Sequence, residues 1–224
     1  MSGKKLTSIK KACEIADSIF ENLIKKLNKK EFKTEKQVAN FINREIWKTK
    51  AKKSFPTIVA SGKNAVNWHH KPTNKKLRKG FCVIDFGAKV NGYCGDMTRT
   101  IYFGKASKTE KRIYSIVKKT NEKSIKKVKA GINAKELYLF AKKNLGAYAL
   151  YFGHGLGHGL GEKVHSNPRI SKKEAFLKKG DIITIEPGVY IPKVLGIRIE
   201  DDVLVTTKGF EVLSKSTKKL IEIQ

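Results

Sequence analysis

Apolar residues recur every three to four positions in the first part of the chain, which is the period of an amphipathic helix. Over residues 6–27 the apolar side chains form one stripe and lysines occupy the other face. Thr34 followed by Gln37 is a capping-box pattern, and it predicts a second helix with an apolar stripe over residues 38–46. An extended segment over residues 56–61 and a polar loop are expected to follow.

The middle of the chain carries the pattern of a β-hairpin. Two apolar runs cover residues 81–88 and 93–103, and Asn91-Gly92 joins them. Asn-Gly between such runs favours a two-residue turn, which fixes the pairing of the two strands. This part of the sequence therefore predicts two paired antiparallel strands.

The rest of the chain repeats the order of helix, helix and strands. Ser107 with Glu110 predicts a helix that runs to about residue 129, and Asn133 begins another that ends near residue 144. A stretch rich in glycine and histidine covers residues 153–161. Two strand-like runs then follow, at residues 181–190 and 197–206. The repeated order predicts one pseudo-symmetric α+β domain over residues 1–224.

Charge is the unusual feature of the composition. The chain has 48 Lys and Arg against 20 Asp and Glu, a formal net charge of +28, and its 40% hydrophobic residues exclude global disorder. Such a charge favours contact with polyanions such as nucleic acid. The basic residues are mostly lysine and are dispersed along the chain, whereas arginine is expected for bidentate readout of phosphates or bases. A solvated lysine surface is therefore favoured over a nucleic-acid site.

Several other classes of protein are excluded. No apolar run approaches the ~20 residues of a membrane span, and the first residues lack the apolar stretch of a signal peptide. Three cysteines are too few and too scattered for a disulfide framework or a zinc knuckle. We expect a cytoplasmic protein with reduced thiols and no membrane partner.

Two aspartates lie on the predicted hairpin. The two-residue turn places Asp85 opposite Thr98 and Asp96 opposite Gly87, so the aspartates are diagonal neighbours on one face. Two such carboxylates repel each other unless a cation or a proton lies between them. The alternative is that one aspartate caps a turn and the other is exposed.

Two glutamates interrupt the later apolar runs. Glu186 lies in DIITIEPGVY and Glu200 in GIRIEDDVLVT, and a carboxylate buried in an apolar strand needs a partner. Arg198 shares a face with Glu200, so a plain salt bridge is the alternative for that pair. Glu186 has no comparable basic neighbour in the sequence.

Three of the five histidines occur in the short stretch GHGLGHGLGEKVH, as His154, His158 and His165. The glycines between them let the backbone approach a ligand closely, and imidazole is both a common metal ligand and a general acid or base. A surface loop with incidental histidines is the less favoured alternative. Four carboxylates with one histidine form a donor set for two divalent cations, better suited to manganese, cobalt or ferrous iron than to a structural zinc.

The ordered segments VIDFGAKVNGYCGDMTRT, GHGLGHGLGEKVHSNPRI, TIEPGVYIP and GIRIEDDVLVT resemble the catalytic domain of the pita-bread metallopeptidases. More narrowly, they are similar to the Xaa-Pro dipeptidase and aminopeptidase P branch of peptidase family M24, over nearly the whole chain. The resemblance implies two helix-helix-strand halves around a curved antiparallel sheet. It also implies a dinuclear metal centre, with Asp96 and Glu200 bridging both ions. The implied ligands are Asp85, Asp96, His158, Glu186 and Glu200.

The same resemblance gives roles to other side chains. The segment TIVASGKNAVNWHHKP resembles the family stretch that carries an active-site histidine, and the register places that role on His69. His154 and His165 correspond to two further histidines that contact the substrate and the developing tetrahedral intermediate. Glu186 is the expected general base. Arg198 is expected to support the carboxylate ligands from behind.

The implied reaction is hydrolysis of the peptide bond between an N-terminal residue and proline. Two divalent metal ions, Mn²⁺ or else Co²⁺, Fe²⁺ or Zn²⁺, would activate the water. The expected partner is a short peptide with a free N-terminus, and a homodimer is the assembly considered. Two alternatives stay open: methionine aminopeptidase of the same fold, and a non-catalytic pita-bread protein that binds nucleic acid. His154 and Arg198 favour the Xaa-Pro branch over the first, and the intact ligand set argues against the second.

The sequence also departs from the family pattern. Members of this branch usually carry a separate N-terminal domain, and we expect residues 1–224 to be a single catalytic domain without it. Ser166 stands where glutamate is common, and Gly95 stands where serine is common. Both positions are beside the implied ligands rather than on them.

Overall fold

The structure is a computed structural model that describes residues 3–224. Its helices and strands occur twice in the same order along the chain, as the sequence predicts. The helices are α1 (Gly3–Asn28), α2 (Glu35–Lys48), α3 (Lys108–Ile125) and α4 (Ala134–Leu145), with the short 3-10 helices η1 (Gly62–Val66) and η2 (Gly146–Tyr151). No helix within residues 3–224 is long and apolar enough to cross a membrane.

The strands form two larger and two smaller hydrogen-bonded ladders. The first larger ladder contains β2 (Ile58–Ser61), β3 (Gly80–Phe86), β6 (Met97–Phe103) and β14 (Glu222–Ile223). The second contains β7 (Gly157–Gly159), β8 (Ser166–Ile170), β9 (Ile182–Ile185), β12 (Asp201–Val205) and β13 (Phe210–Val212). The smaller ladders are β1 (Lys52–Lys53) with β4 (Ala88–Val90) and β5 (Tyr93–Cys94), and β10 (Gly188–Ile191) with β11 (Leu195–Arg198). Named pairs are antiparallel except β14 with β6.

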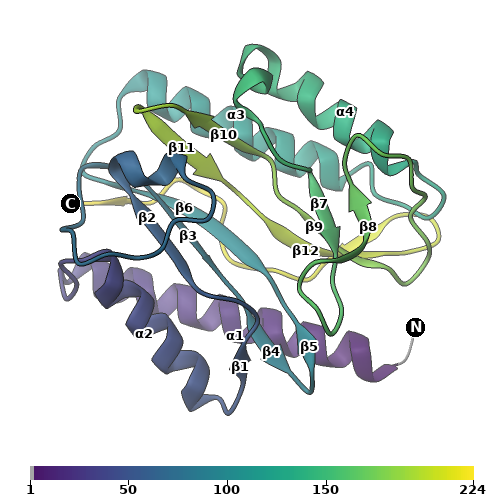
Figure 1. The fold of residues 1–224 in the computed structure, drawn as a ribbon, viewed down its shortest axis with the longest axis horizontal. Helices are drawn as coiled ribbons and strands as arrows, with labels where there is room; N and C mark the ends of the chain where they lie inside the picture. Colours follow the sequence, from purple (N-terminus) through teal and green to yellow (C-terminus); the bar gives the residue numbers. More distant parts are fainter. Residues whose placement is uncertain (1–2) are drawn as a thin grey trace.

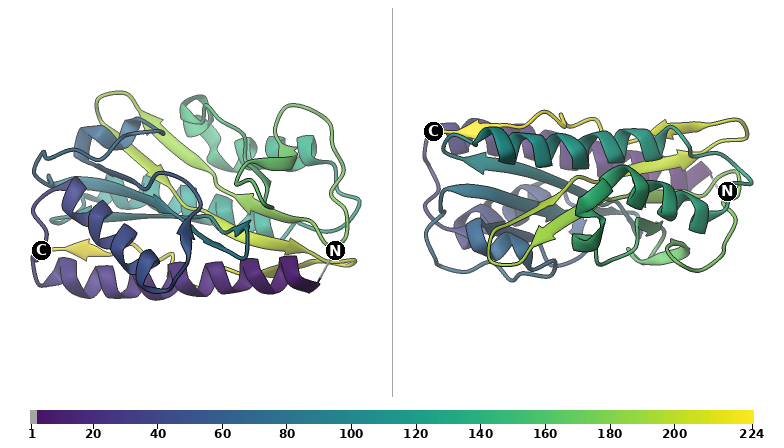
Figure 2. Two further views of the ribbon diagram at one scale, coloured as in Figure 1. Left: turned by 60° about the horizontal axis from the view of Figure 1, so that its bottom comes forward. Right: turned by 90° about the horizontal axis from the view of Figure 1, so that it is seen from above.

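Each pair of helices packs on the strands of its own half. In Figure 1 the α1–α2 pair lies along the bottom of the molecule and the α3–α4 pair along the top, with the strands between them. One apolar cluster joins α1 and α2 to β2, β3 and β6, and another joins α3 and α4 to β9, β11 and β12. The left view of Figure 2 shows the long α1 beneath the strands, and the right view shows the α3–α4 pair from above. The expected α+β architecture of two halves is confirmed.

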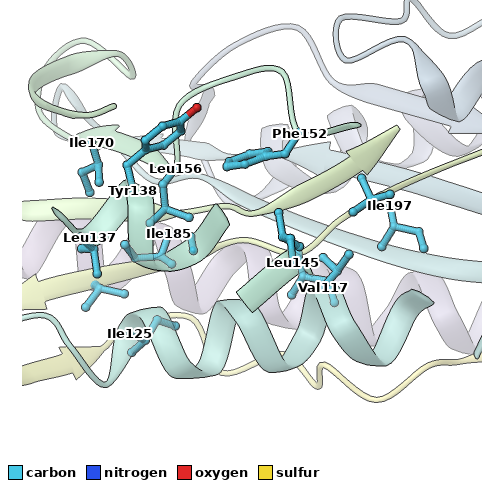
Figure 3. Packing of buried hydrophobic residues seen from close by; sticks show 14 of the residues in the cluster. Val117, Ile125, Leu137, Tyr138, Leu145, Phe152, Leu156, Ile170, Ile185 and Ile197 are labelled. Carbon is cyan, nitrogen blue, oxygen red and sulfur yellow. The ribbon is translucent and has the colours of Figure 1, made fainter. Parts of the chain in front are cut away.

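Packing in the second half follows the helical period of α3 and α4. Their apolar stripes pack against each other and against the neighbouring strands, as Figure 3 shows. Buried residues in this cluster include Val117, Ile125, Leu137, Leu145, Ile185 and Ile197. This core fixes the strands that carry the functional side chains of the second half.

Local sequence signals set most helix boundaries. Thr34 and Ser107 both form complete capping boxes, as predicted. The prediction that the third helix runs to about residue 129 was wrong, because α3 ends at Ile125. The N–H of Val128 donates to the carbonyl of Ile125, and this tight turn lets the Val128 side chain enter the core.

The hairpin has the predicted register. Asp85 pairs with Thr98, and Val90 pairs with Tyr93 across the turn. Asn91 and Gly92 have φ angles of 48° and 87°, the left-handed values that a type I′ turn requires. The Asn-Gly pair therefore fixes which residues of the two strands face each other.

The prediction of two continuous strands near the end of the chain was wrong. Residues 181–190 divide into β9 and β10, and residues 197–206 divide into β11 and β12, with each part in a different ladder. Pro187 has no N–H to continue a ladder, while the N–H of Glu186 donates to the Leu156 carbonyl and that of Glu200 to the Thr98 carbonyl. Both glutamates consequently lie where the chain passes from one ladder to another.

Candidate metal centre

Four carboxylates converge where strands end or change ladder. Asp85 lies near the end of β3, and Asp96 immediately precedes the neighbouring β6. Glu186 follows β9, Glu200 lies between β11 and β12, and His158 lies on β7. All five side chains line one pocket of about 630 Å³, a volume typical of small-molecule sites. The structure thus brings together the five side chains that the resemblance implies as ligands.

The closest grouping in the described residues consists of Asp96, His158 and Glu200, each with a potential ligand atom within 4.8 Å of the others. His158 Nε2 lies 3.7 Å from Asp96 Oδ2 and 3.4 Å from Glu186 Oε1. The other ring nitrogen, Nδ1, lies 3.2 Å from the Gly159 carbonyl oxygen. Because a carbonyl only accepts, Nδ1 carries the proton, and the lone pair of Nε2 faces the carboxylates.

Several carboxylate oxygens in this group have no hydrogen-bond donor among the described residues. They are Asp85 Oδ1, Asp96 Oδ1 and Glu200 Oε1, and all three are buried. A buried carboxylate oxygen without a donor is costly, and a divalent cation removes that cost. Carboxylate oxygens with one imidazole nitrogen are a suitable donor set for such a cation, so these residues fit a divalent metal site.

The carboxylates also perturb one another. Burial raises the pKa of Asp96 well above its usual range, and the neighbouring Glu200 and Asp85 raise it further. Burial, then Glu186 and Asp85, raise the pKa of Glu200 in the same way. Burial raises the pKa of Glu186 to about 7 although Arg198 opposes the shift. In the absence of a cation the group therefore retains protons, which a bound cation would displace.

Arg198 connects the carboxylates from behind. Its Nη2 donates to Asp85 Oδ2 at 2.7 Å, and its Nε donates to Thr98 Oγ1 at 3.1 Å. Thr98 Oγ1 in turn donates to Glu200 Oε2 at 2.6 Å. The ion pair of Arg198 is therefore with Asp85, and Glu200 is reached through Thr98 rather than by the plain salt bridge considered from the sequence.

Tyr190 joins Arg198 to His154. Arg198 Nη1 donates to Tyr190 Oη at 2.8 Å, and Tyr190 Oη lies 2.9 Å from His154 Nε2. His154 Nδ1 lies 2.8 Å from the Gly155 carbonyl oxygen, so Nδ1 carries the proton and Nε2 accepts from the tyrosine hydroxyl. Burial lowers the pKa of His154 to about 3, and the ring stays neutral at ordinary pH.

The other two predicted histidines also line the pocket. His165 is exposed, and its ring stands edge-on to that of His158 with the centroids 4.5 Å apart. Burial lowers the pKa of His165, and Arg169 lowers it further. His69 is exposed and lines the same pocket. All three histidines can therefore meet a ligand that enters the pocket.

Sequence reasoning missed several residues of this site. Thr184 Oγ1 accepts the His158 N–H at 3.1 Å and lies 3.3 Å from Glu186 Oε1, and Tyr190 orients His154. Thr184 and Tyr190 share the parity of Glu186 in the run 181–190, which is a signal that could have identified them. Trp68 and Arg169 also line the pocket, and nothing in their local sequence indicates it.

The chain matches the model of metallopeptidase family M24 over residues 7–207. It is 41% identical over 225 residues to a Xaa-Pro dipeptidase from Pyrococcus horikoshii, covering 98% of this chain and 64% of the relative. A solved X-Pro aminopeptidase from Thermotoga maritima superposes with a TM-score of 0.93 at 34% identity, over 100% of this chain and 64% of that one. A solved prolidase from Pyrococcus furiosus superposes with a TM-score of 0.90 at 38% identity, over 96% of this chain and 65% of that one.

The chain thus spans less than two thirds of the length of these relatives. The match nevertheless includes every segment on which the resemblance rests. The expected likeness to the Xaa-Pro branch is also confirmed by the names of these proteins. The chain belongs to metallopeptidase family M24.

Proposed function

We propose that this chain is a metal-dependent exopeptidase that hydrolyses the bond between an N-terminal residue and proline. The observation that carries the proposal is the convergence of four carboxylates and one imidazole in a pocket, with three buried carboxylate oxygens that lack a donor. The names of the relatives support proline as the residue after the cleaved bond.

The proposed metal ligands are those that the pocket gathers. Two divalent ions, with manganese preferred over cobalt, ferrous iron or zinc, would be held there. Ions at this place would lower the pKa of water toward neutrality and polarise the scissile carbonyl. The full set is Asp85, Asp96, His158, Glu186 and Glu200.

Glu186 is the proposed general base. Its carboxylate lies at the ligand group, with Oε1 3.4 Å from His158 Nε2, so it is within reach of a water held at the ions. In this role Glu186 accepts a proton from the attacking water and passes it to the nitrogen of the leaving proline. Thr184 Oγ1, 3.3 Å from Glu186 Oε1, orients the carboxylate.

The three pocket histidines position the peptide and stabilise the charge that develops on its carbonyl oxygen. His69 and His165 are exposed in the pocket and can donate to that oxygen, a type of contact that stabilises transition states by a few kcal/mol. His154 is held by Tyr190 and the Gly155 carbonyl, so its neutral ring keeps one orientation.

The lining of the pocket is suited to a short peptide. Phe55, Pro56 and Trp68 provide apolar lining for a side chain and a proline ring. Lys71 and Arg169 line the same pocket and are exposed, so their charges are available to a peptide carboxylate. In a Xaa-Pro dipeptide that carboxylate is carried by the proline itself.

A panel of peptides tests the proposal. Metal-stripped protein receives manganese or cobalt and then a Xaa-Pro dipeptide, a Xaa-Pro-Xaa tripeptide or a Met-Ala-Xaa peptide. Metal-dependent cleavage of the Xaa-Pro dipeptide is expected. Cleavage of the methionine peptide alone would assign the chain to methionine aminopeptidase activity instead, and a lack of turnover in folded protein with either metal would reject the proposal.

A further inference from the structure

A buried carboxylate outside the ligand group contacts the segment that carries His69. Glu35 is the first residue of α2, and its side chain is 0% exposed. Its hydrogen bonds go to residues 61–73, which we call the pocket loop because residues within it line the pocket, namely Trp68, His69, His70, Lys71 and Pro72.

Both oxygens of Glu35 accept several hydrogen bonds from this loop. Oε1 accepts from the N–H and hydroxyl of Ser61, at 2.8 and 3.1 Å, and from Asn64 Nδ2 at 2.8 Å. Oε2 accepts from the N–H and hydroxyl of Thr73, at 3.1 and 2.9 Å, and lies 2.9 Å from His70 Nε2. One carboxylate therefore ties down both ends and the middle of the loop.

These donors keep Glu35 ionised. Burial alone would raise the pKa of Glu35, but the hydrogen bonds from Ser61, Asn64 and His70 outweigh it and lower the pKa to about 2. Hydrogen bonds to a charged group are stronger than those between neutral groups. Glu35 therefore accepts these hydrogen bonds as a charged carboxylate over the whole pH range in which a peptidase works.

The residues between these anchors form one wall of the pocket. The Trp68 ring lies 5.2 Å from the His154 ring and 5.5 Å from the Tyr190 ring, measured between centroids. Gly153 leaves room for it, since a Cβ at that position would lie 2.5 Å from the Trp68 ring. These contacts define the place of the Trp68 ring in the pocket wall.

The two halves of the loop are held differently. In the first half, Ala65 packs tightly on β11, because a Cβ on Gly196 would lie 1.9 Å from the Ala65 carbonyl oxygen. In the second half His69 and Lys71 are exposed, and the contacts with Glu35 are those of His70 and Thr73. The half that carries Trp68 and His69 therefore depends on Glu35 through its His70 side.

We propose that Glu35 and His70 are positioning residues, whose hydrogen bond fixes Trp68 and His69 at the pocket. The consequence for catalysis rests on the proposed function, in which His69 acts on the peptide. The consequence for the position of Trp68 is independent of the proposed function. His70 also lines the pocket, but its Nε2 is bonded to Glu35, and the proposed role is exerted through its neighbours in the loop.

The fluorescence of Trp68 gives a readout that needs no activity. The sequence contains two tryptophans, and Trp47 is 77% exposed on α2, away from the pocket lining. Trp47→Phe therefore leaves Trp68 as the single fluorophore. In that background His70→Leu removes the donor to Glu35, while His70→Gln keeps a side-chain N–H at a similar reach.

With His70→Leu we expect greater quenching of Trp68 by acrylamide and a kcat/KM about tenfold lower, mainly through kcat, because misplaced groups cost rate at the transition state. His70→Gln should restore both quantities to those of the Trp47→Phe parent. Thr73→Val removes another donor to the same oxygen and should change them in the same direction. The urea concentration at the midpoint of unfolding is measured for each variant, so that a loss of stability is distinguished from a displacement of Trp68 and His69.

Unchanged quenching in both His70→Leu and Thr73→Val, with folding intact, would overturn the proposal. Equal loss of kcat/KM in His70→Gln and His70→Leu would overturn it as well, because the donor would then be irrelevant. If the variants alter quenching as expected while the parent cleaves no peptide with any metal, the positioning role stands and the proposed function fails.

Discussion

Without divalent cations, the folded chain should become more stable as the pH falls from about 8 to about 7. Burial and neighbouring carboxylates raise the pKa of Asp96 and Glu200 well above the usual range. Burial also raises the pKa of Asp202 to about 8. In the unfolded chain the pKa values of the same groups return to about 4, and the groups release their protons. The folded state therefore binds more protons than the unfolded state in this window.

The expected magnitude follows from proton linkage. Each proton that only the folded state retains lowers the free energy of unfolding by ~1.4 kcal/mol for every unit of rise in pH. Histidines limit the window, because burial lowers the pKa of His154 and His158 to about 3. Below about 6.5 these rings charge in the unfolded chain alone, which opposes the carboxylates.

Urea unfolding of metal-stripped protein at several pH values within this window measures the slope. Asp202→Asn is the matched control: Asp202 is buried and accepts the Asp96 N–H, but it is not a proposed ligand. Its replacement should reduce the slope by up to ~1.4 kcal/mol per unit. Saturating manganese should remove the contribution of the ligands, since they bind the ion deprotonated. A stripped protein whose stability is flat, or rises, from pH 7 to 8 would refute this reasoning.

Two further substitutions test the core and the support of the site. Leu137→Ala on α4 should cost about 2–5 kcal/mol in urea unfolding, because Leu137 is 1% exposed within the core, and a loss near zero would contradict the packing described. Tyr190→Phe removes the buried hydroxyl between Arg198 and His154. It should lower kcat on a Xaa-Pro dipeptide about tenfold and the free energy of unfolding by about 1–3 kcal/mol, because the partners lose a buried hydrogen bond. An unchanged kcat would show that His154 needs no such support.

Much of the site could be predicted because its first half depends on local signals. Asn91-Gly92 fixes the hairpin register, and the register places Asp85 and Asp96 on one face. Capping boxes at Thr34 and Ser107 likewise use residues three positions apart. Such signals need no knowledge of the rest of the chain.

The remainder depends on contacts between distant segments. Nothing near Glu186 or Glu200 in the sequence shows that the strands change ladder there, since the breaks rely on bonds to Leu156 and Thr98. Arg198 was paired with Glu200 by parity, but β11 ends before Glu200, and the guanidinium reaches Asp85 instead. No local pattern in the sequence marks Glu35, because its partners lie from 26 to 38 positions away.

The central claim is that the gathered carboxylates hold the ions on which peptide hydrolysis depends. Titration of manganese into metal-stripped protein, with hydrolysis of a Xaa-Pro dipeptide followed in the same samples, tests it most directly. Activity should be absent with chelator, appear as the sites fill, and stay absent in Asp96→Asn, which removes a ligand charge from the group. Full hydrolysis by the stripped protein, or by folded Asp96→Asn, would contradict the account.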